Sequence, residues 1–291
     1  MIHSYTNLSH PNKVQRSSKF DMKKSPIILS FGLCLVIIFN LVTGAEKEKS
    51  ETTSAFETIQ LDDKFHSERA AFGDFNQDGQ NDIAYGPYWF EGPSFQKRHL
   101  VYKPLPFAIR KYSENFFTYA DDIDADGLPD LLVLGFPAAK RGTYWFKNPG
   151  KGNFDKPWPR FDVFDGVENE SPVWADVTGD GKKEVLCSVK GQFGFVAPAD
   201  PAQPEKPWKF TAITPPKSTG GKFTHGLGFG DLNKDGRADL LEKSGWWEQP
   251  ADDSLWKKHP YVFSADKGGC QMFSYDFDGD GDQDVITAIN A

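Results

Sequence analysis

Residues 122–130 read DIDADGLPD, and this acidic stretch decides the fold because the chain repeats it. The pattern D-x-[D/N/T]-x-D-G-x-x-[D/E] occurs five times, beginning at Asp74, Asp122, Asp176, Asp231 and Asp276. The copies are 48, 54, 55 and 45 residues apart, and a short apolar run follows each one. A period in this range indicates a stack of supersecondary units, each too small to bury its own apolar face.

The nine-residue loops, numbered one to five in chain order, have the composition of sites for a hard cation. Oxygen-bearing side chains recur at positions 1, 3, 5 and 9, position 6 is always glycine, and position 7 varies as expected if only its carbonyl coordinates. This chemistry predicts Ca2+ as the cofactor. The predicted ligands are Asp74, Asn76, Asp78, Gln80 and Asp82; Asp122, Asp124, Asp126, Leu128 and Asp130; Asp176, Thr178, Asp180, Lys182 and Glu184; Asp231, Asn233, Asp235, Arg237 and Asp239; Asp276, Asp278, Asp280, Asp282 and Asp284.

Two alternatives to this metal site are weighed. An EF-hand requires a bidentate Glu at position 12 and flanking helices, but only loop four has that Glu, and strand-like runs follow the loops. The second alternative is that the loops are solvated turns, because Asp, Asn and Gly are ordinary turn residues. However, the five loops place 18 carboxylates in 45 residues, and this charge repels itself unless cations compensate it. Thr178 makes loop three the weakest candidate.

Each repeat contains the elements of four strands. A short apolar lead-in precedes the acidic loop, and a second strand follows it. An aromatic strand comes next, at residues 88–93, 144–149 and 246–250. An outer strand completes the unit, at residues 97–101, 158–161, 208–211 and 256–260. Four-stranded units with this period predict an all-β chain of β-propeller blades, in which the recurring tryptophans pack between neighbouring blades.

The lead-in and loop at residues 72–79, FGDFNQDG, and its four counterparts resemble FG-GAP/VCBS repeats, the family that includes the integrin α-subunit propeller. The resemblance covers residues 56–291. It implies a ring, usually of seven blades, with calcium held between the first two strands of a blade. Five repeats are visible and the sequence stops in the second strand of the fifth, so we expect a truncated seven-bladed ring. A partner chain that completes the ring is the alternative.

The N-terminal 45 residues predict a secretory signal with an extended or misassigned start. Lys23 and Lys24 precede an apolar stretch at residues 27–42, which makes Met22 the expected start. An uncleaved membrane anchor is the alternative. Residues 46–55 form a linker, and no stable membrane span is expected after cleavage. The chain would then be secreted, periplasmic or on the cell surface.

The charge of the remaining chain excludes one class of partner. Residues 46–291 have 28 basic and 40 acidic residues, a net charge of −12, which five divalent ions would reduce to −2. Nucleic-acid binding requires a basic surface, so we expect no nucleic-acid partner.

The resemblance also implies that the first strand of each blade lines a central channel and that the acidic loop caps one end of it. Residues about six positions before each loop are then predicted to lie about 20 Å from it, at the opposite mouth. The candidates for a polar site there are His66, Glu68, Glu170 and His225. The alternative is that they are ordinary polar residues facing water at the starts of strands.

Three functions are open at this point. The first is an exported calcium-binding propeller that binds protein or glycan. The second is a carbohydrate-active lyase or dehydratase, because the blade motifs are similar to those of aldos-2-ulose dehydratase; the four channel-mouth residues would then contact substrate. The third is a scaffold domain of a larger exported enzyme.

Overall fold

The computed structural model describes residues 58–135, 142–264 and 268–288, and from Gln60 onward these residues belong to one compact unit. Within the described ranges the chain is all-β, with 18 strands and no helix. No described segment is therefore a helix long and apolar enough to cross a membrane. The predicted leader and most of the linker lie outside the described residues.

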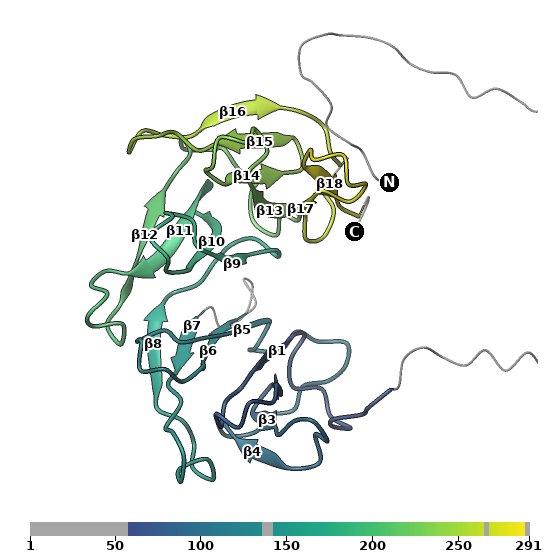
Figure 1. Cartoon of the computed structure of the whole chain (residues 1–291), viewed down its shortest axis with the longest axis vertical. Helices are drawn as coiled ribbons and strands as arrows, with labels where there is room; N and C mark the ends of the chain where they lie inside the picture. The colour runs from purple at the N-terminus through teal and green to yellow at the C-terminus, as the bar shows by residue number, and fades with distance from the viewer. Residues whose placement is uncertain (1–57, 136–141, 265–267, 289–291) are drawn as a thin grey trace, which may run out of the picture. The chain divides into compact units, whose positions relative to one another are not determined.

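Consecutive strands form five antiparallel sheets, which we name blades 1 to 5 (Figure 1). Four blades have four strands in sequential order, and blade 5 has two. Blade 1 contains β1 (Ala70–Gly73), β2 (Asp82–Tyr85), β3 (Tyr88–Phe90) and β4 (Arg98–Leu100). Blade 2 contains β5 (Phe117–Asp121), β6 (Asp130–Leu134), β7 (Thr143–Phe146) and β8 (Arg160–Phe164). Blade 3 contains β9 (Val173–Ala175), β10 (Glu184–Val189), β11 (Gln192–Pro198) and β12 (Trp208–Ala212). Blade 4 contains β13 (Leu227–Gly230), β14 (Asp239–Glu242), β15 (Gly245–Glu248) and β16 (Lys257–Pro260), and blade 5 contains β17 (Phe273–Tyr275) and β18 (Asp284–Ile286).

Every acidic loop connects the first strand of a blade to the second in the same register. The residue before position 1 pairs with position 9, as in Gly73 with Asp82 and Asp121 with Asp130. The other three pairs are Ala175 with Glu184, Gly230 with Asp239 and Tyr275 with Asp284. Each loop thus starts as the first strand ends, and its last residue begins the second strand.

The second strands of blades 2 and 4, β6 and β14, are buried on both faces, which explains their continuous apolar sequences. In β6, Leu131 and Val133 pack into one core cluster, whereas Leu132 and Leu134 pack into another. Neighbouring residues of a strand point to opposite faces, so a strand between two cores requires apolar residues at every position.

Four hydrophobic cores lie between consecutive blades. Trp89 of blade 1 shares a cluster with Phe146 of blade 2, and Trp145 of blade 2 shares one with Trp208 of blade 3. Blades 3 and 4 meet through Leu186 and Trp247, and blades 4 and 5 through Trp246 and Met272. The recurring tryptophans therefore pack between neighbouring blades, as the sequence predicts.

The predicted four-stranded blades are confirmed, with one strand that the sequence pattern did not identify. Blade 3 has no tryptophan in its third strand, β11. There Phe195 pairs with Leu186, whereas in blade 2 Trp145 pairs with Leu132, the residue equivalent to Leu186. The truncated seven-bladed ring stays a prediction. Cys187 is buried and Cys270 is exposed, and neither forms a disulfide.

Candidate functional site

Each acidic loop turns through two left-handed backbone positions. Position 6 is glycine in all five loops, with φ of 83–88°. Position 4 is also left-handed, with φ of 57–78°, although it is Gln77, Ala125 and Lys234 in three of the loops and glycine in two. Non-glycine residues rarely adopt this conformation, so the surrounding hydrogen bonds must hold the loop in place.

The carboxylate at position 1 provides part of that support. In loop two, Asp122 accepts the N–H of Asp126 at 3.0 Å and the N–H of Gly127 at 2.8 Å. A bond from the position-6 glycine to position 1 is present in all five loops. The carboxylate at position 5 accepts the N–H of position 7 at 2.8–3.0 Å in every loop. Backbone N–H groups of the loop therefore orient the side chains at positions 1 and 5.

The carboxylate at position 9 ties the loop to the body of the blade. Asp82, Asp130, Asp239 and Asp284 are 0% exposed, and Glu184 is 4% exposed. In blade 2, one oxygen of Asp130 accepts the N–H of Ile123, at position 2 of the loop, and the other accepts the N–H of Asn148, which follows β7. Asp82 and Asp239 make the same pair of bonds in blades 1 and 4.

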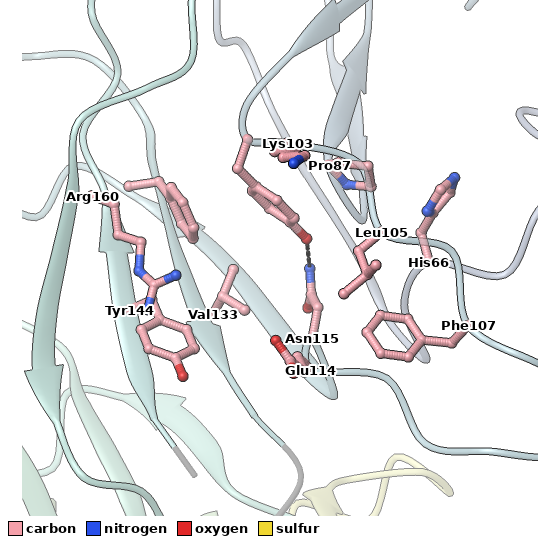
Figure 2. Close-up of a pocket in the computed structure, with 12 residues that line it drawn as sticks. His66, Pro87, Lys103, Leu105, Phe107, Glu114, Asn115, Val133, Tyr144 and Arg160 are labelled. Atoms are coloured by element: carbon pink, nitrogen blue, oxygen red, sulfur yellow. Dashed lines mark hydrogen bonds between the residues drawn. The ribbon is translucent and has the colours of Figure 1, made fainter. Parts of the chain in front are cut away.

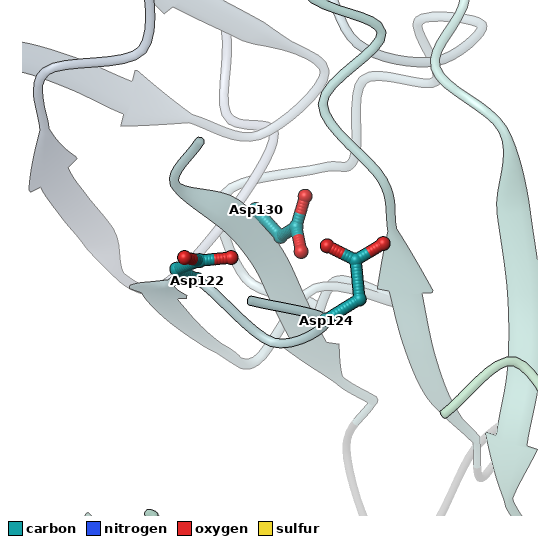
Figure 3. A group of neighbouring side chains, drawn as sticks. All are labelled: Asp122, Asp124 and Asp130. Atoms are coloured by element: carbon teal, nitrogen blue, oxygen red, sulfur yellow. The ribbon is translucent and has the colours of Figure 1, made fainter. Parts of the chain in front are cut away.

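Three loops bring their carboxylates into one cluster. In loop two, one oxygen each of Asp122, Asp124 and Asp130 lies within 4.8 Å of the others (Figure 3). Loops three and five gather three carboxylates in the same way, from Asp176, Asp180 and Glu184, and from Asp276, Asp278 and Asp284. One oxygen of Asp124 is buried without a hydrogen-bond partner among the described residues. One oxygen of Asp284 is also unpaired, but the described part of blade 5 has no third strand to donate the N–H that position 9 accepts in blades 1, 2 and 4. A buried, unpaired carboxylate oxygen beside two further carboxylates suits a bound cation.

Burial also raises the pKa of the position-9 carboxyl groups of loops one to four. It raises the pKa of Asp130 to about 7, and the nearby Asp124 carboxylate adds to the rise. Burial likewise raises the pKa of Glu184 to about 7 and that of Asp239 to about 6, with contributions from the carboxylates at positions 1 and 5. The protein alone therefore disfavours the fully ionised clusters, and a cation would offset this cost.

Loops one and four have asparagine at position 3. The amide N–H of Asn76 donates to Asp78 at 3.1 Å, and that of Asn233 donates to Asp235 at 3.0 Å. In loop three the hydroxyl of Thr178 lies 3.4 Å from a carboxylate oxygen of Glu184. These loops keep an oxygen atom at position 3, as the predicted ligand set requires, but each offers one carboxylate fewer than loop two.

A lysine of blade 2 contacts the cluster of loop two. Lys147, which directly follows β7, contacts the Asp124 carboxylate and lies 2.9 Å from Asp126. These two carboxylates raise the pKa of its ammonium group, against the opposing effect of burial. At the corresponding place blades 1 and 4 have Glu91 and Glu248, which contact His99 and His259 instead. Loop two therefore has a lysine beside its carboxylates where blades 1 and 4 have a glutamate, whereas in loop four the guanidinium of Arg237, at position 7, pairs with Asp235.

The structure brings together two of the four predicted channel-mouth residues. Nε2 of His225 lies 3.0 Å from a carboxylate oxygen of Glu170, and the Glu170 N–H donates to the carbonyl of Thr224. The hydroxyl of Ser171 donates to the carbonyl of Cys270. The segments leading into blades 3, 4 and 5 therefore meet at this point.

The other two predicted residues have contacts of their own. The Glu68 carboxylate accepts the N–H of Ser113 at 2.8 Å and also the Ser113 hydroxyl. His66 is buried, packs edge-on against the ring of Tyr88, and has its Nε2 3.9 Å from Asp62. The described contacts of His66 and Glu68 therefore lie with blades 1 and 2, separate from the Glu170–His225 pair.

A cleft of 190 Å³ lies where His66 meets blade 2 (Figure 2). Arg160, whose guanidinium lies 3.9 Å from the ring centre of Tyr144, faces Phe107 and Leu105 across the cleft. The Asn115 amide donates to the Tyr102 hydroxyl at 2.9 Å. The remaining lining residues are His66, Pro87, Lys103, Glu114, Val133 and Phe146.

Sequence reasoning missed the left-handed position 4, the contact of Lys147 with loop two and the cleft. One bond of position 9 did have a signal in the sequence. A Gly, Asn or Gln followed by proline comes after the third strand of blades 1, 2 and 4, and the N–H of that Gly, Asn or Gln donates to the carboxylate at position 9. The cleft had no such signal, since its lining comes from several separate segments.

Comparisons with known proteins agree with this architecture. The family described as FG-GAP-like repeat matches residues 122–187, from loop two to the second strand of blade 3, so this part of the chain carries an FG-GAP-like repeat. A search of curated proteins gives no match.

Two solved structures are similar to the chain at low identity. One is a lectin from Agrocybe aegerita that recognises non-reducing terminal N-acetylglucosamine, with 20% identity and a TM-score of 0.47 over 75% of this chain and 60% of the lectin chain. The other is the V. cholerae biofilm matrix protein Bap1, with 16% identity and a TM-score of 0.36 over 60% of this chain and 29% of Bap1. The matched region thus spans less than two thirds of either protein.

Proposed function

We propose that this chain is an exported binding module for protein or glycan, with blades that are stabilised by calcium in the acidic loops. The observation that carries the calcium assignment is the gathering of three carboxylates in each of loops two, three and five, one of which, Asp124, keeps a buried oxygen without a partner among the described residues. The side chains at positions 1, 3, 5 and 9 and the carbonyl at position 7 would hold the ion. The ligand atoms are all oxygen, which favours calcium over zinc or copper.

The ion would supply positive charge to a site that the protein has already shaped. Positions 1 and 5 are oriented by backbone N–H groups, and position 9 joins the loop to the third strand. A cation that binds only this arrangement stabilises the folded state by mass action. Rigid blades joined by exposed loops would then present the binding surface.

Export is supported by the predicted signal at residues 22–45 and by the acidic charge of the rest of the chain. Calcium is abundant outside the cell, so loops of this composition suit an exported protein.

Calcium titration of the chelator-stripped chain, followed by calorimetry, tests this proposal. We expect saturable binding at more than one site and weaker binding of magnesium, because magnesium requires near-ideal octahedral geometry and retains its water. A chain that shows no heat of calcium binding would contradict the proposal.

Lys147→Met should tighten calcium binding at loop two about two- to fivefold. The substitution removes an ammonium group that competes for Asp124 and Asp126, and an ion pair of this partial exposure contributes up to about 1 kcal/mol. The measurement is a calcium titration of the wild type and the variant.

Two controls isolate the effect. Lys97→Met removes an exposed lysine that pairs with Glu91, outside the acidic loops, and should leave calcium affinity unchanged. In a background of Asp124→Asn the effect of Lys147→Met should be smaller, since Lys147 then contacts only the Asp126 carboxylate. Equal effects of Lys147→Met in both backgrounds would contradict the assignment.

A further inference from the structure

The segment at residues 103–112, which joins β4 to β5, differs from the rest of this acidic chain. It reads KPLPFAIRKY and has three basic residues and no acidic one, whereas residues 46–291 have a net charge of −12. Lys103, Arg110 and Lys111 are all exposed. The segment is therefore a local basic site on an acidic molecule.

The same segment also exposes large apolar side chains. Ile109 is 87% exposed, Tyr112 is 57% exposed and Leu105 is 56% exposed. Apolar groups that are exposed together on a soluble surface mark interaction sites more often than isolated ones do. Basic and apolar groups therefore alternate along one short stretch.

The backbone holds this stretch in place. The N–H of Phe107 donates to the carbonyl of Phe65 at 2.8 Å in an antiparallel bridge, and the N–H of Lys111 donates to the carbonyl of Ala108. Pro104 and Pro106 restrict the backbone on either side of Leu105. A surface that is ordered before binding loses less conformational entropy when a partner docks.

The 190 Å³ cleft described above adjoins the segment, because Lys103, Leu105 and Phe107 form one of its walls (Figure 2). Its opposite wall includes Tyr144 and Arg160. Its volume suits one apolar side chain, and anchor residues that fill such clefts dominate the energetics of protein interfaces.

We propose that residues 103–112 and this cleft form a docking surface for an acidic peptide segment of a partner protein. One apolar side chain of the peptide fills the cleft, further apolar side chains cover Ile109 and Tyr112, and carboxylates face Lys103, Arg110 and Lys111. This inference rests on the proposed binding role and names the chemistry of the partner. A neutral sugar would leave both the exposed aliphatic groups and the basic groups unmatched, whereas a peptide with acidic and apolar residues matches both.

The test uses the full chain in calcium and a fluorescein-labelled peptide of alternating Glu and Leu residues, with binding followed by fluorescence anisotropy. We expect saturable binding that weakens with added salt, and no binding of the matching peptide of Lys and Leu. Ile109→Ser and Lys103→Glu should each weaken binding about tenfold, because each removes a central contact of an exposed site. Thermal melting verifies that each variant is folded.

Matched controls lie on blade 4 and blade 3. Val262→Ser removes an apolar group that is 76% exposed just after β16, and Lys209→Glu reverses an exposed charge in β12. Both should bind the peptide as the wild type does. The proposal is overturned if the acidic peptide does not bind, or if the control variants lose as much affinity as the two test variants.

Two further probes identify other occupants. Binding of phosphatidylglycerol vesicles or of oligogalacturonate that depends on Ile109 and Lys103, without binding of the peptide, would overturn the proposal in favour of a membrane or an acidic glycan. A chain that binds calcium but fails to bind the peptide overturns this inference alone. A chain that binds the peptide but not calcium contradicts the calcium assignment and leaves this inference standing.

Discussion

Asp130→Ala should lower the free energy of unfolding by about 2 to 6 kcal/mol, even in the presence of a chelator. The Asp130 side chain is 0% exposed and accepts the N–H groups of Ile123 and Asn148. Alanine would leave both donors without an acceptor in a buried place, at about 1 to 3 kcal/mol each. The measurement is urea unfolding of the wild type and the variant in EDTA.

Asp126→Ala in the same loop is the matched control. Asp126 is exposed, and its carboxylate accepts the N–H of Leu128 at the surface. Its replacement should change stability in EDTA by less than about 1 kcal/mol. With calcium present both variants should lose stability, because both remove a predicted ligand. Equal losses for the two variants in EDTA would show that position 9 has no structural role beyond the ion.

Phe75→Ala should destabilise the chain by about 3 to 5 kcal/mol, which is the usual effect of emptying a buried aromatic site. Phe75, at position 2 of loop one, is 0% exposed and packs against Trp89 of its own blade and Trp158 of the segment leading into β8. Its carbonyl also accepts the side-chain amide of Asn148 at 2.9 Å. The residue thus joins the acidic loop of blade 1 to blade 2.

Phe277→Ala provides the comparison at the same position of loop five. Phe277 is 43% exposed and its ring packs edge-on against Tyr275. Its replacement should cost about 1 to 2 kcal/mol, because only part of its side-chain area is buried. Urea unfolding of both variants in calcium measures the difference. Similar losses at the two positions would contradict the role assigned to Phe75 between blades 1 and 2.

The repeat pattern was enough to predict the blades, because it reports two local properties. Apolar residues at every position of a second strand, as in Leu131 to Leu134, require two cores, and the acidic loops fix where those strands begin. The third strand of blade 3 was missed because Phe195 takes the place of the tryptophan that marks this strand elsewhere. The position of β11 is determined by its pairing with β10 and β12, and the residue pattern alone did not reveal that pairing.

The candidate site was predictable to the extent that it depends on spacing. Spacing was enough to predict that carboxylates of one loop gather, as those at positions 1, 3 and 9 do in loops two and five and those at positions 1, 5 and 9 do in loop three, whereas their role as metal ligands stays a prediction. The contact of Lys147 with Asp124 could not, since it depends on how the third strand ends against the loop. The prediction that His225 and Glu170 belong to one site agrees with their 3.0 Å contact, whereas the Glu68 carboxylate is bonded to Ser113. Side chains in irregular lead-in segments follow local hydrogen bonds, which a fixed offset from the loop does not specify.

Thermal melting with and without a chelator tests the central claim most directly. Each ion bound at a hundredfold excess over its Kd stabilises the folded chain by about 2.7 kcal/mol, which corresponds to about 5 to 10 °C in the melting temperature for a domain of this size. The midpoint in calcium should therefore lie well above the midpoint in EDTA, and calcium added back should restore it. In Asp280→Ala, which removes a predicted ligand of loop five, the difference between calcium and EDTA should shrink. Coincident melting curves in calcium and EDTA would contradict the claim that calcium stabilises these blades.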